Sequence, residues 1–309
     1  MMTQIKSALS TCPLDGMIYL IYRISETSGF FMVRRHLVYM VLNKEFIPHQ
    51  NVATEFLQLN TDIEISSIER AQQFPSGKYN MLELLPVKEG YDDSVLASFV
   101  NLCMTHAEHG DEVGFVDFFY SLIELFQYPR EQDYKNLIGL FGELSFLRYV
   151  YSRTGIDLSE KWHIEGGASK YDIAIEKGNI EIKSTRSSDA LITIKHNQLF
   201  NADRNFLATV MLDESPDGIT LNQLLSVLRC QSSGFRGYSF ALNLEKEKRR
   251  ISPIDAETRH LKAIEFKVYD ATAVNPFKQV PENVSNLIYQ LDLADQQEVV
   301  LNELLGNVH

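Results

Sequence analysis

The stretch 170–186, KYDIAIEKGNIEIKSTR, constrains the fold of this chain more than any other part of the sequence. Apolar and polar residues alternate in residues 171–176 and again in residues 179–184, as they do in β-strands that bury one face. Lys177-Gly178 lies between the two runs and supplies a residue that tolerates positive φ, which a tight turn requires. The stretch therefore predicts a β-hairpin.

Three charged residues share the polar face of this hairpin, because side chains two apart on a strand point the same way. They are Asp172, Glu181 and Lys183. Two carboxylates in a half-buried setting repel each other unless a cation or a proton lies between them. A divalent metal would remove the repulsion, and Lys183 beside it could hold or help deprotonate a water molecule. Cross-strand ion pairs on a solvated face, each worth only a few tenths of a kcal/mol, are the alternative.

Residues 133–153, before the hairpin, predict a helix whose middle is apolar nearly all round. Glu143 is the only acid in that middle, and a lone carboxylate in a buried helix is costly unless it is paired or bound to a cation. A salt bridge to Arg148 or to a surface lysine is the alternative to a metal. Gly139 and Gly142 would let the helix lie close against a sheet. Glu143 is therefore a further candidate for the charged site.

The spacing of Asp172, eight further residues and then Glu181-x-Lys183 resembles the active-site signature of the PD-(D/E)XK nuclease superfamily. Tyr171 replaces the proline that names the superfamily. In these nucleases the aspartate and the glutamate bind magnesium and the lysine assists the attacking water. The preceding helix often carries a glutamate that points into the metal site. Residues 135–275, including ITIKHNQLF and GITLNQLLSVLR, resemble the restriction-like bacterial proteins known as PD-(D/E)XK motif proteins.

This resemblance implies an α/β (α+β) fold class with a restriction-endonuclease-like core, in which helices flank a mixed β-sheet. The nuclease domain would occupy residues 131–309, including a C-terminal extension. Strand patterns at 190–194, 206–212 and 263–270 follow the hairpin, with a helical pattern at 219–229 and a helical tail from 281 onward. The expected sheet combines these strands with the hairpin.

The resemblance also implies a role for each site residue. Asp172 and Glu181 would bind Mg²⁺, for which Mn²⁺ can substitute, and the backbone carbonyl of Ile182 would be a further ligand. Glu143 would bind a second ion or orient the waters of the first. Gln198 lies where some members place a polar residue that contacts the site or the attacking water, although a loop or capping role fits it equally well.

Residues 1–130 predict a separate β-rich N-terminal domain with two helices and a role in recognition or partner docking. Residues 17–42 predict two strands joined by a Ser-Gly turn. His106 and His109 lie near the polar end of a helix with no third ligand nearby, so we expect them to face solvent.

The composition limits the partners and the location. A formal net charge of -12 argues against a protein that coats nucleic acid nonspecifically, because such affinity comes from neutralised phosphates. It does not exclude a nuclease, since a bound metal offsets part of the charge locally. Cys12, Cys103 and Cys230 are too widely separated for a zinc knuckle. No apolar run is long enough to cross a membrane and the N-terminus lacks a signal peptide, so we expect a cytoplasmic protein without membrane contact.

The resemblance, together with the charged residues of the hairpin, implies a Mg²⁺-dependent DNA endonuclease that acts in restriction-modification or anti-phage defence. A nuclease-fold subunit that serves as a DNA-binding or assembly module is the alternative. Expected partners are DNA, a second copy of the chain, and ATPase or methyltransferase proteins. The basic stretch 245–262 predicts either contact with a DNA backbone or a solvated loop. Glycoside hydrolysis fits less well, because Lys183 would keep the neighbouring carboxylate ionised and unable to act as a general acid.

Overall fold

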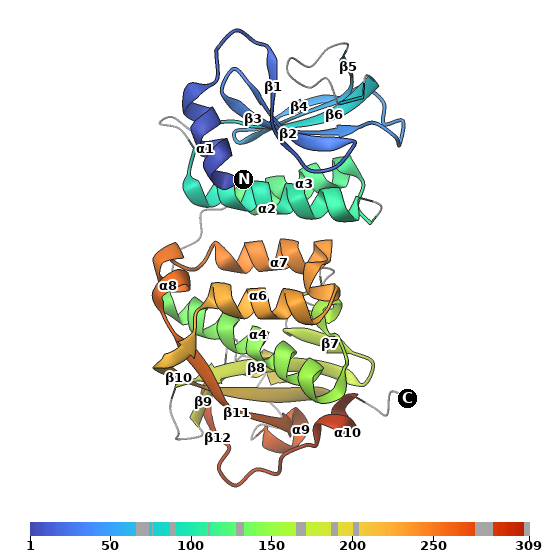
Figure 1. Cartoon of the computed structure of the whole chain (residues 1–309). Helices are drawn as coiled ribbons and strands as arrows, with labels where there is room; N and C mark the ends of the chain where they lie inside the picture. The colour runs from blue at the N-terminus through green and yellow to red at the C-terminus, as the bar shows by residue number, and fades with distance from the viewer. Residues whose placement is uncertain are drawn as a thin grey trace. The chain divides into compact units, whose positions relative to one another are not determined.

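The computed structural model describes residues 1–65, 74–75, 77–86, 91–110, 112–127, 133–164, 171–186, 191–199, 204–275 and 287–305. The chain divides into two compact units, Met1–Arg130 and Glu131–His309, whose elements are labelled in Figure 1. Each unit has its own main sheet and its own helices. Within the described ranges, no helix combines the length and the apolar character that crossing a membrane would need.

The N-terminal unit is built on a six-stranded antiparallel sheet with the order β1-β2-β3-β6-β5-β4. Its elements are α1 (Met2–Thr11), β1 (Ile18–Arg23), β2 (Ser28–Val33), β3 (His36–Leu42), β4 (Asn51–Ala53), β5 (Leu57–Ile65), β6 (Gly77–Leu84), α2 (Asp93–His109) and α3 (Phe115–Gln127). Residues 17–42 thus form three strands rather than the two expected. Arg34 and Arg35 have φ values of 51° and 66°, because they make the two-residue turn between β2 and β3.

His106 of α2 is buried in this unit, so the expectation that it faces solvent is wrong. Its Nδ1 lies 3.0 Å from the hydroxyl of Tyr39, and its ring stacks on Phe118 with 4.3 Å between the centroids. Burial lowers the pKa of His106 to about 4, which keeps the imidazole neutral at neutral pH. His109 is partly exposed and contacts Glu112. His106 therefore serves the packing of α2 against the sheet and α3.

The C-terminal unit contains a four-stranded mixed sheet with the order β11-β10-β8-β7. Its strands are β7 (Ile173–Ile175), β8 (Gly178–Thr185), β10 (Asn205–Ile219) and β11 (Leu261–Asp270). β8 and β10 are parallel, and the other neighbours are antiparallel. Four helices lie on one side of it (Figure 1): α4 (Tyr134–Thr154), α6 (Leu221–Gln231), α7 (Tyr238–Lys248) and α8 (Pro253–Thr258). The predicted fold class, an α+β core with a mixed sheet flanked by helices, is confirmed.

A second, two-stranded sheet covers the other side. In it β9 (Leu191–Lys195) pairs antiparallel with β12 (Ile288–Asp292). Leu207 of β10 and Tyr269 of β11 pack against this layer, next to the short helices α5 (His196–Leu199) and α9 (Ala271–Val274). The sequence predicts that the strand at 190–194 joins the main sheet and that the chain is helical from 281 onward. Both expectations are wrong in the described residues, because β9 and β12 pair with each other before the helix α10 (Leu301–Leu305).

The predicted hairpin forms, with its turn one residue earlier than expected. Ile175 pairs with Gly178, so the turn is Glu176-Lys177 and Gly178 is the first residue of β8. Gly178 has a φ of 145°. A Cβ at this position would lie 1.7 Å from the carbonyl oxygen of Arg204, which accepts a hydrogen bond from the backbone of Asn179. The glycine is required because the chain entering β10 passes directly over it.

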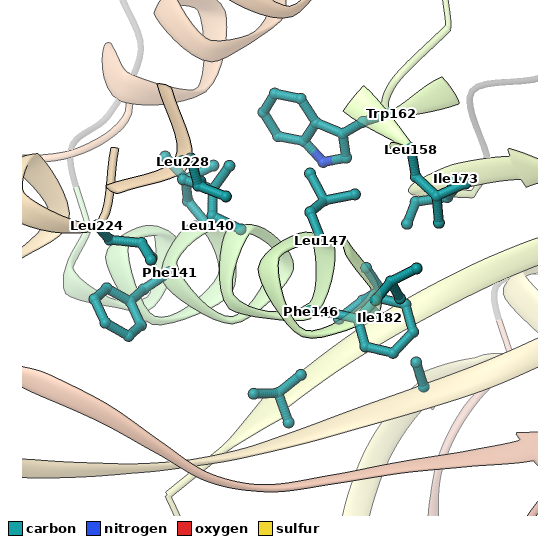
Figure 2. Packing of buried hydrophobic residues seen from close by; sticks show 14 of the residues in the cluster. Leu140, Phe141, Phe146, Leu147, Leu158, Trp162, Ile173, Ile182, Leu224 and Leu228 are labelled. Carbon is teal, nitrogen blue, oxygen red and sulfur yellow. The ribbon is translucent and has the colours of Figure 1, made fainter. Parts of the chain in front are cut away.

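The main core of the C-terminal unit surrounds α4. Buried side chains of α4 pack with Leu224 and Leu228 of α6 and with Ile182 of β8 in one cluster (Figure 2). The side chain of Asp133 caps the first turn of the helix. Gly155, with a φ of 72°, ends it in the left-handed conformation. The helix is therefore fixed at both ends and along its length.

Gly142 is where α4 lies closest to the hairpin. A Cβ at this position would lie 1.8 Å from Oγ of Ser184 on β8, which no real contact allows. A Cβ at Gly139 would meet nothing within 4 Å. The expected close approach of the helix therefore depends on Gly142 and not on Gly139.

We predict that Gly142→Ala destabilises the C-terminal unit by about 1–3 kcal/mol, because the added methyl group pushes α4 away from β8. Gly139→Ala is the matched control and should stabilise the unit by up to about 1 kcal/mol, since alanine favours the helix. Trp162 is the only tryptophan of the chain, so its fluorescence during urea unfolding reports on this unit. Equal unfolding midpoints for the two variants would contradict the prediction.

Candidate metal centre

Three side chains that could ligate a metal converge between α4 and the start of the hairpin. They are Glu143 of α4, His163, which follows the 3₁₀ turn Ser159–Lys161, and Asp172, the residue before β7. One ligand atom of each lies within 4.8 Å of the others. Two ligands of one ion are about 3–4.5 Å apart when each metal bond is about 2.2 Å. The three side chains can therefore contact a single divalent ion.

Glu143 points into this cluster. Its Oε2 accepts a hydrogen bond from Nε1 of Trp162 at 2.9 Å and lies 2.9 Å from Nε2 of His163. These partners take the place of the salt bridge to Arg148 that the sequence left open. Because Trp162 is itself packed in the core, its indole fixes the carboxylate from the buried side.

His163 was not selected from the sequence, although it lies beside the predicted residues. Its φ is 50°, a conformation that costs a non-glycine residue free energy and that clusters at functional sites. The backbone N–H of His163 donates to the carbonyl of Asp172 at 2.9 Å. Nδ2 of Asn243 donates to the carbonyls of both Trp162 and His163, at 3.2 and 3.0 Å. The surrounding structure therefore holds the imidazole against Glu143.

Asp172 lies where its charge is costly. Burial raises its pKa well above the ordinary value of 3.8, and the charges of Glu143 and Glu181 raise it further. The backbone N–H of Ile182, which donates to Oδ2 at 2.6 Å, and the charge of Lys183 oppose this shift without cancelling it. In the absence of an added cation, Asp172 therefore keeps its proton to a higher pH than an ordinary aspartate does.

Glu181 and Lys183 form a close pair on β8. Oε1 of Glu181 lies 2.6 Å from Nζ of Lys183, and the side chains are 3% and 24% exposed. Burial raises the pKa of Glu181, while Lys183 opposes the shift. Glu181 lies outside the group of three, but its charge acts on Asp172. The solvated ion pair offered as the alternative does not describe this setting, because Glu181 is almost fully buried.

Residues 34–294 match a protein family described as "Putative PD-(D/E)XK family member" (DUF4420). The chain belongs to this family. The resemblance drawn from the hairpin signature is confirmed, and the α+β core is a nuclease-like fold. No curated protein and no solved structure matches the chain.

The Glu-x-Lys pair of this PD-(D/E)XK protein also occurs on β11, as Glu265 and Lys267. Nζ of Lys267 lies 3.1 Å from Oε1 of Glu265, with side chains 33% and 46% exposed. This pair lies at the surface, outside the cluster of ligating residues found in the described ranges. Burial beside Asp172 and Glu143, rather than the two-residue spacing, distinguishes the pair on β8.

Of the two remaining predicted site residues, the structure describes Ile182 fully and Gln198 only by its backbone. Ile182 has its side chain in the core and its backbone N–H bound to Asp172, which places its backbone beside the cluster. Gln198 falls in α5, and its side chain lies outside the described residues. Its role stays a prediction.

The basic stretch 245–262 is largely neutralised within the PD-(D/E)XK unit. The ion pairs are Lys248–Glu245 at 3.2 Å, Arg250–Glu247 at 3.0 Å, Arg259–Glu214 at 2.9 Å, Arg259–Asp255 at 3.4 Å and Lys262–Asp217 at 2.8 Å. Cations already held by carboxylates offer less to a phosphate backbone. The solvated, ion-paired interpretation therefore fits this stretch better than a DNA track.

The charge of His163 is set by competing effects. Burial lowers its pKa, but the hydrogen bond and charge of Glu143, with the charges of Glu247 and Glu181, outweigh burial and raise the pKa above 6.5. When His163 is protonated, its imidazolium and the ammonium of Lys183 offset part of the negative charge of the carboxylates.

We predict that Asp172→Asn stabilises the metal-free protein at neutral pH. The native pKa of Asp172 is raised, so the native state keeps a proton that the unfolded state releases, and stability falls as the pH rises from about 4 through the native pKa. The asparagine does not titrate. Its advantage in EDTA should therefore grow with pH and disappear below about pH 4, as measured by urea unfolding with Trp162 fluorescence. An advantage that is the same at every pH would contradict this cause.

Proposed function

We propose that the protein is a divalent-metal-dependent DNA endonuclease of the PD-(D/E)XK type. The observation that carries the proposal is the cluster of Glu143, Asp172 and the buried Glu181, in which desolvation and the neighbouring carboxylates raise the pKa of Asp172, beside the ammonium of Lys183. Such an arrangement lowers stability until a cation binds, and it is retained where function needs it. Membership of the family supports the same activity.

The residues divide the work of phosphodiester hydrolysis. A divalent ion, Mg²⁺ with Mn²⁺ as a substitute, would polarise the phosphate and lower the pKa of a bound water. Asp172 and Glu143 would hold the ion, with Glu181 and the carbonyl of Ile182 as further ligands. Lys183, kept in place by Glu181 at 2.6 Å, would position the attacking water and stabilise the charge that develops on the phosphate.

The biological setting of this proposal is restriction or defence against foreign DNA in the cytoplasm. Cutting both strands of a duplex calls for two active sites, and a two-fold dimer matches the symmetry of DNA. The proposed partners are therefore DNA, a second copy of the chain, and an ATPase or methyltransferase that supplies translocation or modification. Recognition or partner docking is the role proposed for residues 1–130.

A second candidate is a nuclease-fold subunit that binds or assembles while a partner cuts. The observation that favours it is the ion-paired state of the stretch 245–262, which leaves DNA contact to other surfaces or other chains. Incubating the purified chain with plasmid DNA in Mg²⁺ or EDTA separates the candidates, since only the endonuclease cuts alone and in Mg²⁺.

We predict that Lys183→Ala lowers the cleavage rate by a factor on the order of 10² to 10³, because it removes one preorganised charge from the transition state. Asp172→Ala should be equally inactive through loss of the metal. DNA affinity, measured in Ca²⁺ to prevent turnover, should change little for Lys183→Ala.

Lys267→Ala is the matched control, since it breaks a second Glu-x-Lys pair on a strand of the same unit. It should cut at the wild-type rate, because an exposed pair contributes only about 0–1 kcal/mol to stability. A Lys183→Ala protein that is folded by Trp162 fluorescence and cuts as fast as Lys267→Ala would overturn the proposed mechanism.

A further inference from the structure

His163 is the one member of the three-residue group to which the resemblance to the nucleases assigns no role. Its Nε2 faces Oε2 of Glu143 at 2.9 Å, and both belong to the set of ligand atoms that includes Asp172. The imidazole nitrogen therefore points at the position where an ion held by the two carboxylates would lie.

We propose that His163 is a metal ligand and that it makes this site favour a divalent transition ion, such as Mn²⁺, over Mg²⁺. The inference rests on the proposed metal site and adds the class of metal that the site takes. In this proposal the imidazole nitrogen of His163 is a ligand in addition to the carboxylates of Glu143 and Asp172.

Several contacts fix the conformation of His163. The residue adopts a φ of 50°, and three backbone hydrogen bonds hold the segment in that conformation: one from its N–H to Asp172 and two from Asn243. Its ring also packs edge-on against Trp162, with 4.6 Å between the centroids. A strained conformation persists only where the surrounding contacts hold it in place. Such contacts also orient the side chains that bind metals.

The donor set decides the metal class. Mg²⁺ prefers oxygen ligands and keeps several of its waters. Imidazole suits transition ions, and the affinity of mixed nitrogen and oxygen sites rises along the series from Mn²⁺ to Cu²⁺. In a site with two carboxylates and one imidazole, the bond to the imidazole nitrogen therefore stabilises a transition ion more than it stabilises Mg²⁺.

A role as a counter-ion is the competing explanation for the same contact. An imidazolium that only neutralises Glu143 would compete with any metal, so its removal would strengthen the binding of both ions. A ligand behaves in the opposite way, because its removal weakens the transition ion and leaves Mg²⁺ nearly unchanged.

His163→Asn is the variant to use, because asparagine tolerates the left-handed conformation that position 163 requires. His260→Asn is the matched control, since His260 lies just before β11 and outside the three-residue group, with Nδ1 of its ring 3.0 Å from the carbonyl oxygen of Thr258. Binding of Mn²⁺ and of Mg²⁺ is measured by calorimetry on the full chain. Pulsed EPR of the Mn²⁺-loaded protein detects the ¹⁴N coupling of a bound imidazole directly.

We expect the wild type and His260→Asn to show this coupling, and His163→Asn to lose it. The affinity of His163→Asn for Mn²⁺ should fall about tenfold or more, while its affinity for Mg²⁺ should stay within about twofold. Wild-type protein without ¹⁴N coupling overturns the inference, as does a His163→Asn protein with an unchanged or higher Mn²⁺ affinity.

These results are independent of the proposed nuclease activity. Imidazole-bound Mn²⁺ in a protein that cuts no DNA would support the inference and defeat the endonuclease. Cleavage that depends on Lys183, in a protein whose Mn²⁺ shows no imidazole coupling, would support the endonuclease and overturn the inference.

Discussion

The close approach of α4 to β8 at Gly142 is the contact on which the site depends. It leaves no room for a side chain between the helix and Ser184. The next residue on the helix is Glu143, and a helix turns by about 100° per residue, so its carboxylate points away from Ser184 and lies beside His163 and Asp172. A larger residue at position 142 would move Glu143 together with the helix. The packing of Gly142 against β8 thus sets the position of the charge on Glu143, the next residue.

That electrostatic arrangement explains why the same charges behave differently on two strands. Glu265 and Lys267 on β11 are solvated, and water screens each from its surroundings. Glu181 and Lys183 are a similar pair, yet burial raises the pKa of the glutamate and its charge reaches Asp172. In a low-dielectric setting the repulsion between neighbouring carboxylates is stronger, so a bound cation would stabilise them more than it would at the surface.

The sequence indicated which candidate residues lie close together where their geometry is local. Alternation along the hairpin put Asp172, Glu181 and Lys183 on one face, and the apolar surroundings of Glu143 marked it as an acid that needs a partner. These patterns work because side-chain direction follows directly from strand and helix periodicity. The same rule failed for β9, since a strand pattern states that a segment is extended and not which strand it pairs with.

His163 could not be found in this way. It lies outside a regular strand or helix, in a left-handed conformation that Asn243 fixes from 80 residues away in the chain. The sequence does show an aromatic residue and a potential metal ligand, Trp162 and His163, just before the hairpin. Only the fold shows that the indole of Trp162 donates a hydrogen bond to Glu143. The turn at Gly178 was misplaced for a related reason, because the atom that excludes a side chain there belongs to Arg204.

The ion pairs of the stretch 245–262 explain how the net charge of -12 affects binding to DNA. The described cations of the stretch 245–262 are largely held by carboxylates of the same unit, so they add little to a general attraction for DNA. In the proposed nuclease, a metal held by these carboxylates would supply the local positive charge that a phosphate needs. Metal binding would therefore control access of the phosphate as well as the chemistry, which favours a nuclease that engages DNA at its active site over one that coats the duplex.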